Sequence, residues 1–167
     1  MISTKRETQT KSHTEREKRQ ILVFRSAGQE LGLDISCVRE VLRLQAIYPL
    51  PKTPPFIEGV IDLRGRIVVL VDLAKKLGNT GTEEEPNKRI IVCRVRKFIV
   101  GLMVSRLREI IALSQDEITA TPEVVPVRLE SEVISSMARI GDRIIPLLDL
   151  EHLLTRKEAN ELSDLKP

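Results

Sequence analysis

The stretch Gly32-Leu-Asp-Ile-Ser-Cys-Val-Arg-Glu-Val-Leu-Arg-Leu44 returns, with changes, as Gly101-Leu-Met-Val-Ser-Arg-Leu-Arg-Glu-Ile-Ile-Ala-Leu113. Six of the 13 positions are identical, and four more exchange one aliphatic residue for another. Further along, Arg66-Ile-Val-Val-Leu-Val-Asp-Leu73 matches Arg143-Ile-Ile-Pro-Leu-Leu-Asp-Leu150 at five of eight positions. The chain is therefore built as two related halves. This duplication predicts a groove between the halves and two similar but distinguishable surfaces, an arrangement that suits an adaptor.

The composition favours a β-rich protein with an aliphatic core. Hydrophobic residues make up 41% of the 167 residues, and nearly all of them are Ile, Leu and Val. The chain has no Trp, one Tyr and three Phe, so an aromatic ligand pocket is disfavoured. The length allows one domain or two small lobes that share a core.

The net charge of +3 comes from the N-terminal 20 residues, which hold six Lys or Arg against three Glu. From Ile21 onward, 21 basic residues balance 21 acidic ones, so no nucleic-acid partner is expected. Residues 1–19 are polar and lack an apolar period, which predicts a disordered basic tail. Solvated tails of this kind are the commoner case, and attachment to anionic lipid or nucleic acid is the alternative.

The chain is expected in the cytoplasm. Its N-terminus lacks the apolar region of a signal peptide, and the longest aliphatic run, Ile67–Val71, is too short for direct membrane insertion. Cys37 and Cys93 stand alone in aliphatic surroundings typical of small buried residues. The cysteine count by itself leaves a disulfide open.

Short strands and tight turns alternate along both halves. A helical period after Ser36 and again after Ser105 predicts two short helices. Asp72 is expected to cap a helix over Leu73–Leu77, and Asp149 the last ordered helix, before a polar C-terminal tail over residues 156–167. The expected strands are Ile21–Arg25, Glu30–Ile35, Val60–Arg64, Ile67–Val71, Arg89–Val95, Phe98–Val104, Val133–Ile140 and Arg143–Leu148.

This pattern predicts a mostly β fold made of two small barrels. The folded body is expected to cover residues 20–155. Lobe one would hold residues from about 20 to 80 together with a returning C-terminal segment, and lobe two residues from about 88 to 148. The loop Asn79–Asn87, with Gly81, three consecutive Glu and Pro86, would join them.

No catalytic, cofactor-binding or metal-binding residues are predicted. The two histidines are His13, in the tail, and His152, three residues after Asp149, where a helix N-cap explains the spacing better than an acid–base pair. No pair of His or Cys has metal-ligand spacing, and phosphate-binding or nucleophile-elbow motifs are absent from the sequence. A small hydrolase that uses distant Asp, Ser and His residues is the least favoured alternative, under which His152→Ala would abolish activity.

The run Leu50-Pro-Lys-Thr-Pro-Pro-Phe-Ile-Glu-Gly-Val-Ile-Asp-Leu-Arg-Gly-Arg-Ile-Val-Val-Leu-Val-Asp-Leu73 resembles the signature of the CheW family, the coupling proteins of bacterial chemosensory arrays. The segment from Phe24 to Val41 is similar to the same family, as is Ile145-Pro-Leu-Leu-Asp-Leu150 in the second half. The resemblance covers roughly residues 20–155. One departure is Asp62, where the family more often has Asn.

The resemblance implies two five-stranded SH3-like barrels around a shared hydrophobic core. It also implies a non-catalytic adaptor, monomeric when free, that bridges the cytoplasmic tips of chemoreceptors to the regulatory domain of a CheA-type histidine kinase. A relative serving pilus or gliding motility, or second-messenger control, is the alternative circuit. The implied receptor-binding residues are Val38, Glu40, Gly59, Arg64 and Ile67, and the implied kinase-binding residues are Leu107 and Ile110.

Each of these assignments has a structural alternative. The amphipathic pattern alone favours Val38 and Leu107 as core residues. Without the family resemblance, Arg64 would be a solvated strand residue paired with Asp62, two positions away on the same face.

Overall fold

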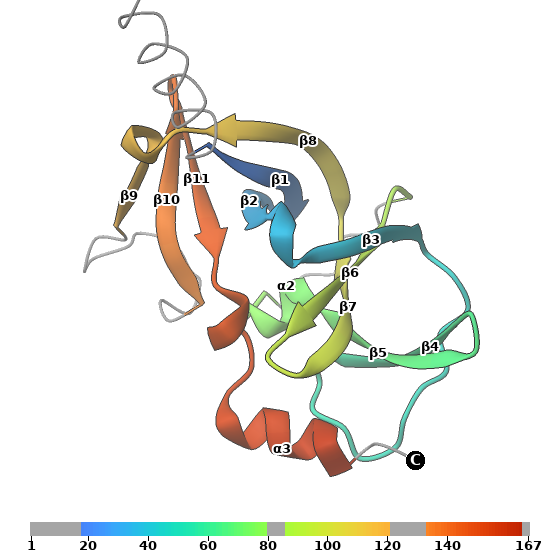
Figure 1. The fold of residues 1–167 in the computed structure, drawn as a ribbon. Coiled ribbons are helices and arrows are strands. Elements are labelled where there is room, and N and C mark those ends of the chain that lie inside the picture. The colour runs from blue at the N-terminus through green and yellow to red at the C-terminus, as the bar shows by residue number, and fades with distance from the viewer. Residues whose placement is uncertain (1–17, 80–85, 121–132, 165–167) are drawn as a thin grey trace, which may run out of the picture.

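A computed structural model describes residues 18–79, 86–120 and 133–164 of the chain. These residues form a mostly β fold with two sheets (Figure 1), which confirms the predicted fold class. Most of the expected basic tail, the acidic part of the loop between the halves, and the connector with Pro122 and Pro126 lie outside the described residues.

The first sheet, which we call the six-stranded lobe, has the strand order β8-β1-β2-β11-β10-β9. The short strand β9 adds to the free edge of β10, so this sheet has one strand more than the five implied by the family resemblance. Its strands are β1 (Arg19–Ser26), β2 (Gln29–Asp34), β8 (Arg106–Leu113), β9 (Ile118–Ala120), β10 (Ile134–Ile140) and β11 (Arg143–Leu148).

The second sheet, the five-stranded lobe, has the order β3-β6-β7-β5-β4. The hairpin between β4 and β5 turns at Arg64-Gly65, where both residues have positive φ. Its strands are β3 (Val38–Arg43), β4 (Ile57–Leu63), β5 (Arg66–Asp72), β6 (Arg89–Val95) and β7 (Phe98–Val104).

The two halves of the sequence exchange their first hairpins. The hairpin β1–β2 of the first half joins β8 and β11 of the second, and the hairpin β6–β7 of the second half joins β3 and β5 of the first. Each sheet therefore takes strands from both halves, so its membership differs from the expected lobes of residues about 20–80 with a returning C-terminal segment and about 88–148. Sequence position gave no hint of the exchange, because strand pairing between the halves is non-local.

Two equivalent glycines lie where the exchanged hairpins meet their new neighbours. Gly32 of β2 is paired in parallel with Leu147, and Gly101 of β7 with Leu70. A Cβ atom on Gly32 would lie 2.6 Å from Cδ2 of Leu147, and one on Gly101 would lie 3.2 Å from Cδ1 of Leu70. Each glycine therefore lets the backbone pass beneath a leucine of the other half.

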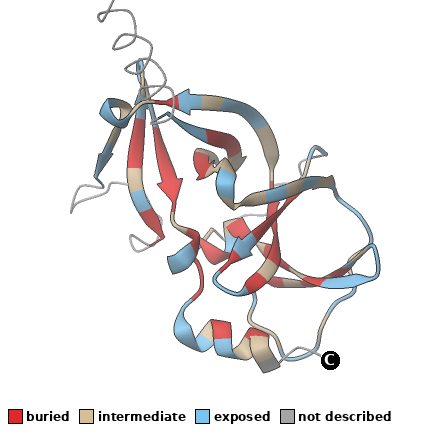
Figure 2. Cartoon of the chain, in the orientation of Figure 1, coloured by how far each residue is buried: buried red, intermediate tan, exposed pale blue. Residues whose placement is uncertain are grey.

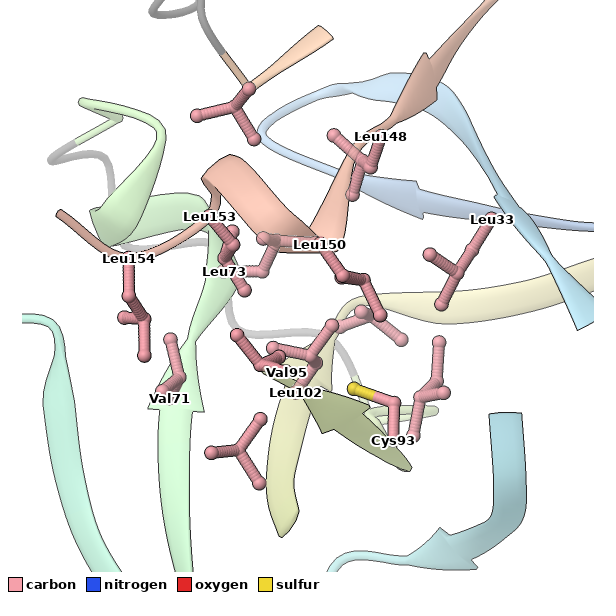
Figure 3. Packing of buried hydrophobic residues seen from close by; sticks show 14 of the residues in the cluster. Leu33, Val71, Leu73, Cys93, Val95, Leu102, Leu148, Leu150, Leu153 and Leu154 are labelled. Atoms are coloured by element: carbon pink, nitrogen blue, oxygen red, sulfur yellow. The ribbon is translucent and has the colours of Figure 1, made fainter. Parts of the chain in front are cut away.

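The apolar residues form three cores rather than one. Alternate residues of β1 face different cores: Ile21 and Val23 face the core of the six-stranded lobe, while Leu22 and Phe24 face a central core between the lobes. Figure 2 shows buried residues along the strands at this junction, and Figure 3 shows the packing of the central core. The shared core implied by the family resemblance is thus present, and it includes Leu33, Val71, Leu73, Cys93, Val95, Leu102, Leu148, Leu150, Leu153 and Leu154.

The short helices follow the sequence only in part. Asp72 caps α2 (Leu73–Lys76), accepting a 3.3 Å hydrogen bond from the backbone N–H of Lys75, as expected. The helices predicted after Ser36 and Ser105 are wrong, because the residues form the edge strands β3 and β8. The 3₁₀ turn η1 (Ile35–Cys37) stands at the place of the first predicted helix. Two further 3₁₀ turns lie in the second half, η2 (Gln115–Glu117) and η3 (Leu150–His152).

The C-terminal residues form a packed helix, α3 (Arg156–Asp164), so the expected polar tail is wrong over that range. Ala159 and Leu162 are buried against the central core. The Nζ atom of Lys76, on α2, lies 2.8 Å from Oε1 of Glu158 and 4.9 Å from the ring centre of Phe56. The polar sequence hid this helix because only two of its side chains enter the core.

Gly32→Ala is expected to lower the free energy of unfolding by about 1–3 kcal/mol, because the new methyl group overlaps Leu147 and Ile21 in a packed core. Urea denaturation measures the change. The control is Gly141→Asn: Gly141 has a φ of 57° and open space around its Cβ position, and Asn tolerates that backbone conformation. Equal stability of Gly32→Ala and wild type would contradict the close approach.

Candidate partner-binding faces

The turn between β4 and β5 presents Arg64 at the tip of a hairpin. Arg64 and Gly65 have φ values of 52° and 84°, the left-handed pair that a two-residue hairpin turn requires. The Oδ1 atom of Asp62 accepts a 2.8 Å hydrogen bond from the backbone N–H of Gly65. An Asn side chain offers the same acceptor, so the departure from the family pattern at this position preserves the turn.

Arg64 forms an ion pair with Glu40 of β3, a strand that is not its neighbour in the sheet. One guanidinium nitrogen of Arg64 lies 2.7 Å and 3.0 Å from the two carboxylate oxygens of Glu40. The Arg64 side chain is 74% exposed and that of Glu40 is 27% exposed. The alternative that Arg64 is a strand residue paired with Asp62 is therefore wrong.

Three apolar residues accompany this ion pair on the five-stranded lobe. Ile67 is 58% exposed and Val41 is 38% exposed, whereas Val38 is partly buried against the central core. Pairing and alternation place all three on the sheet face that carries the central core, since Val38 lies opposite Cys93 and Val41 opposite Ile91. We call Val38, Glu40, Val41, Arg64 and Ile67 the first face; Glu40 lies opposite Val92, so it leaves β3 on the other side from the three apolar residues and joins the face through Arg64.

Sequence reasoning missed the exposure of Val41 because a helical period put it on the buried side with Val38 and Leu42. In the strand, Val41 points away from Leu42, which packs against the core of the five-stranded lobe. The signal that would have found Val41 is its equivalent in the second half, Ile110, a predicted contact residue that is also exposed.

The second half repeats the first face on the six-stranded lobe. Leu107 is partly buried against the central core, and Ile110 and Ile144 are 57% and 59% exposed. They occupy the positions of Val38, Val41 and Ile67 in the duplicated sequence. We call Leu107, Glu109, Ile110, Arg143 and Ile144 the second face, in which Glu109 and Arg143 leave their strands on the side of the six-stranded lobe's own core. Ile144 was missed by sequence reasoning, although its equivalence to Ile67 would have identified it.

The charges of the second face are bound within a network. Guanidinium nitrogens of Arg143 lie 2.8 Å from Oε1 of Glu109 and 3.0 Å from Oε2 of Glu30. Arg108 lies 3.2 Å from the other carboxylate oxygen of Glu30. The hydrogen bond from Arg143 lowers the pKa of Glu30, and the charges of Arg143, Arg108 and Arg25 add to the effect.

Gly59 has a structural role, and the receptor contact expected for it stays a prediction. It is buried, with a φ of 146°, and a Cβ atom there would overlap the carbonyl oxygen of Tyr48. Tyr48 and Val60 exchange two backbone hydrogen bonds of 2.8 Å beside it. The close backbone approach that the glycine permits is therefore made by the proline-containing segment of the chain itself.

The described residues contain no group of three His, Cys, Asp or Glu side chains placed to hold a metal ion. Asp149 accepts a hydrogen bond from the backbone N–H of Glu151 and also contacts Nδ1 of His152 at 2.6 Å, so the expected cap is present.

Cys37 and Cys93 are free, and burial raises the pKa of the Cys93 thiol to about 12. No helix among the described residues is long and apolar enough to span a membrane.

The family model of the CheW-like domain matches residues 20–158. The chain belongs to this family. It is 32% identical over 139 residues to the chemotaxis protein CheW of Klebsiella aerogenes, covering 83% of each chain. It is 31% identical over 142 residues to the chemotaxis protein CheW of Thermotoga maritima, covering 85% of this chain and 91% of the relative.

Among solved structures, the crystal structure of the scaffolding protein TtCheW from Thermoanaerobacter tengcongensis matches with a TM-score of 0.78 and 31% identity. The match covers 84% of this chain and 95% of that one. These relatives support an adaptor role in chemotaxis signalling for this CheW-like domain.

Glu30→Gln is expected to flatten the pH dependence of stability in acid. The pKa of Glu30 is lower in the folded protein than its ordinary value of 4.5. Its contribution to the free energy of unfolding is therefore present above pH 4.5 and is lost as the pH falls through the folded pKa. Solvent screening keeps the contribution below about 1 kcal/mol. Urea denaturation from pH 7 to pH 3 checks this, with Glu161→Gln on α3 as the control; parallel curves for Glu30→Gln and wild type would contradict it.

Proposed function

We propose that this CheW-like domain is a non-catalytic cytoplasmic adaptor that couples chemoreceptors to a CheA-type histidine kinase. The observation that carries the proposal is the pair of faces, related by the internal duplication, on two lobes that share one core. A protein with two such faces holds two partners in a fixed relative position, so that a change in one partner biases the other.

The first face has the chemistry expected for a receptor helix. Val41 and Ile67 offer exposed apolar area, and Val38 extends this area to the edge of the central core. Arg64 lies at the tip of a turn and is mostly exposed, so its remaining guanidinium donors are free to meet a carboxylate of the partner. Glu40 holds the guanidinium in place, which fixes the register of the incoming helix.

The second face suits a different partner, which we assign as the kinase regulatory domain. Its arginine, Arg143, is bound between Glu30 and Glu109, so the exposed side chains that remain are mainly apolar. Ile110 and Ile144 would supply the buried centre of the interface, with Leu107 beside them. Apolar centres of this kind contribute most of the binding energy of protein interfaces.

Arg64→Ala is expected to weaken binding of a purified chemoreceptor tip by about tenfold or more, because an exposed charged hydrogen-bond donor of the interface is removed. Binding of the kinase regulatory domain is expected to stay within about twofold of wild type. The ion pair with Glu40 is largely exposed, so the free energy of unfolding should change by less than about 1 kcal/mol. Arg156→Ala, which removes an exposed arginine of α3, is the matched control for charge.

Ile110→Glu is expected to give the opposite result, with loss of kinase binding and retention of receptor binding. The new carboxylate would be buried without a partner in the interface, which costs more than the lost apolar contact. Isothermal titration calorimetry of both variants against both partners gives the four affinities. If either substitution weakens both partners equally, the assignment of the two faces fails.

A further inference from the structure

A cleft rich in arginine lies beside the second face. It has a volume of about 390 Å³ and is lined by Asn87, Arg89, Arg106, Leu107 and Arg108. Arg89 begins β6 opposite Val104, the last residue of β7, and the chain then passes Ser105 into β8. The cleft therefore lies where strands of both lobes meet.

The positive charges of the cleft are poorly compensated. Among the described residues, Arg106 has no acidic partner, and the guanidinium of Arg89 donates a 3.0 Å hydrogen bond only to the backbone carbonyl of Lys88. Arg108 has one acidic partner, Glu30, which it shares with Arg143. Within the described part of the chain, the three guanidinium groups of the cleft thus have one acidic partner, Glu30, which Arg143 also binds.

Strand pairing adds to this imbalance. Arg89 lies directly opposite Arg43 of β3, and Arg106 lies directly opposite Arg25 of β1. Like charges at directly opposed positions of an antiparallel pair destabilise a sheet. Arg25 also lies directly opposite Glu30, which offsets one of these repulsions in part, and an anion bound in the cleft would relieve the repulsion that remains.

The lining indicates which anion fits. Guanidinium groups bind oxyanions through paired hydrogen bonds. The lining has no aromatic ring, so no nucleobase would stack there. Leu107 forms the apolar wall, and it lies on the same strand and the same sheet face as the exposed Ile110. The cleft is therefore continuous with an apolar protein-binding face.

We propose that the arginine cleft binds an acidic segment of the protein partner that covers Leu107 and Ile110, with carboxylates of that segment between Arg89 and Arg106. The identity of that partner as the kinase regulatory domain rests on the proposed function, whereas the chemistry of the cleft does not. The continuity with Ile110 favours a protein segment over a small free anion, since a small anion would leave the adjoining apolar surface exposed.

The test compares wild type, the double variant Arg89→Gln/Arg106→Gln and the control Arg94→Gln/Arg156→Gln, which removes two exposed arginines of β6 and α3. Binding of the kinase regulatory domain is measured by calorimetry at three salt concentrations. The double variant is expected to bind about tenfold more weakly at low salt, with a weaker salt dependence, while the control stays within about twofold. Its melting temperature should equal or exceed that of wild type, because each substitution removes a like-charge pair.

Two probes separate this proposal from the proposed function. Hexaglutamate should bind wild type and the control weakly but measurably, and should not bind the double variant. If the kinase domain fails to bind wild type, the proposed function fails, and loss of hexaglutamate binding in the double variant still supports the cleft. Equal affinities of the double variant and the control overturn the proposal, as does a cleft that binds inorganic tripolyphosphate but neither hexaglutamate nor the kinase domain.

Discussion

The rest of the structure depends on one constraint. Each exchanged hairpin passes closely beneath a leucine of the other half. A methyl group at Gly32 would overlap Leu147, and one at Gly101 would overlap Ile90 of its own hairpin and lie in tight contact with Leu70. Both glycines stand at the same position of the repeat. Because each half completes the sheet of the other, neither lobe is formed by its own half alone. The two faces are consequently held at a fixed distance, which is what an adaptor between two proteins requires.

The continuous aliphatic runs of the strands follow from this exchange. A strand with one solvated face alternates polar and apolar residues, whereas Ile90–Cys93 is apolar throughout because successive side chains enter the core of the five-stranded lobe and the central core in turn. The central core ends at the margins of both sheets. Val41, Ile67, Ile110 and Ile144 lie on the core-bearing faces beyond those margins and remain exposed. The exposed apolar residues of both candidate faces therefore lie at the uncovered borders of the surface that joins the lobes.

Local signals in the sequence predicted the strands and turns, and they failed where pairing is non-local. Phe98–Val104, Arg89–Val95 and Arg143–Leu148 were predicted with their observed bounds. The edge strand at Val38 was mistaken for a helix because six residues with apolar positions three and four apart fit both periods. The ion pair of Glu40 with Arg64 joins residues 24 positions apart, so no local pattern identified it; the family resemblance named both residues but not their contact.

The same duplication that builds two similar faces also shows how they came to differ. At the tip of the last hairpin, the first half has Arg64 and the second half has Gly141 at the equivalent position. Both halves keep a glutamate on the edge strand, Glu40 or Glu109, but Glu109 takes its guanidinium from Arg143, which lies on a strand and also binds Glu30. A cation at a hairpin tip remains available to a partner, whereas a cation held between two carboxylates does not. The position of one arginine, at the hairpin tip or between two carboxylates, is therefore a difference in available charge between two faces of common origin.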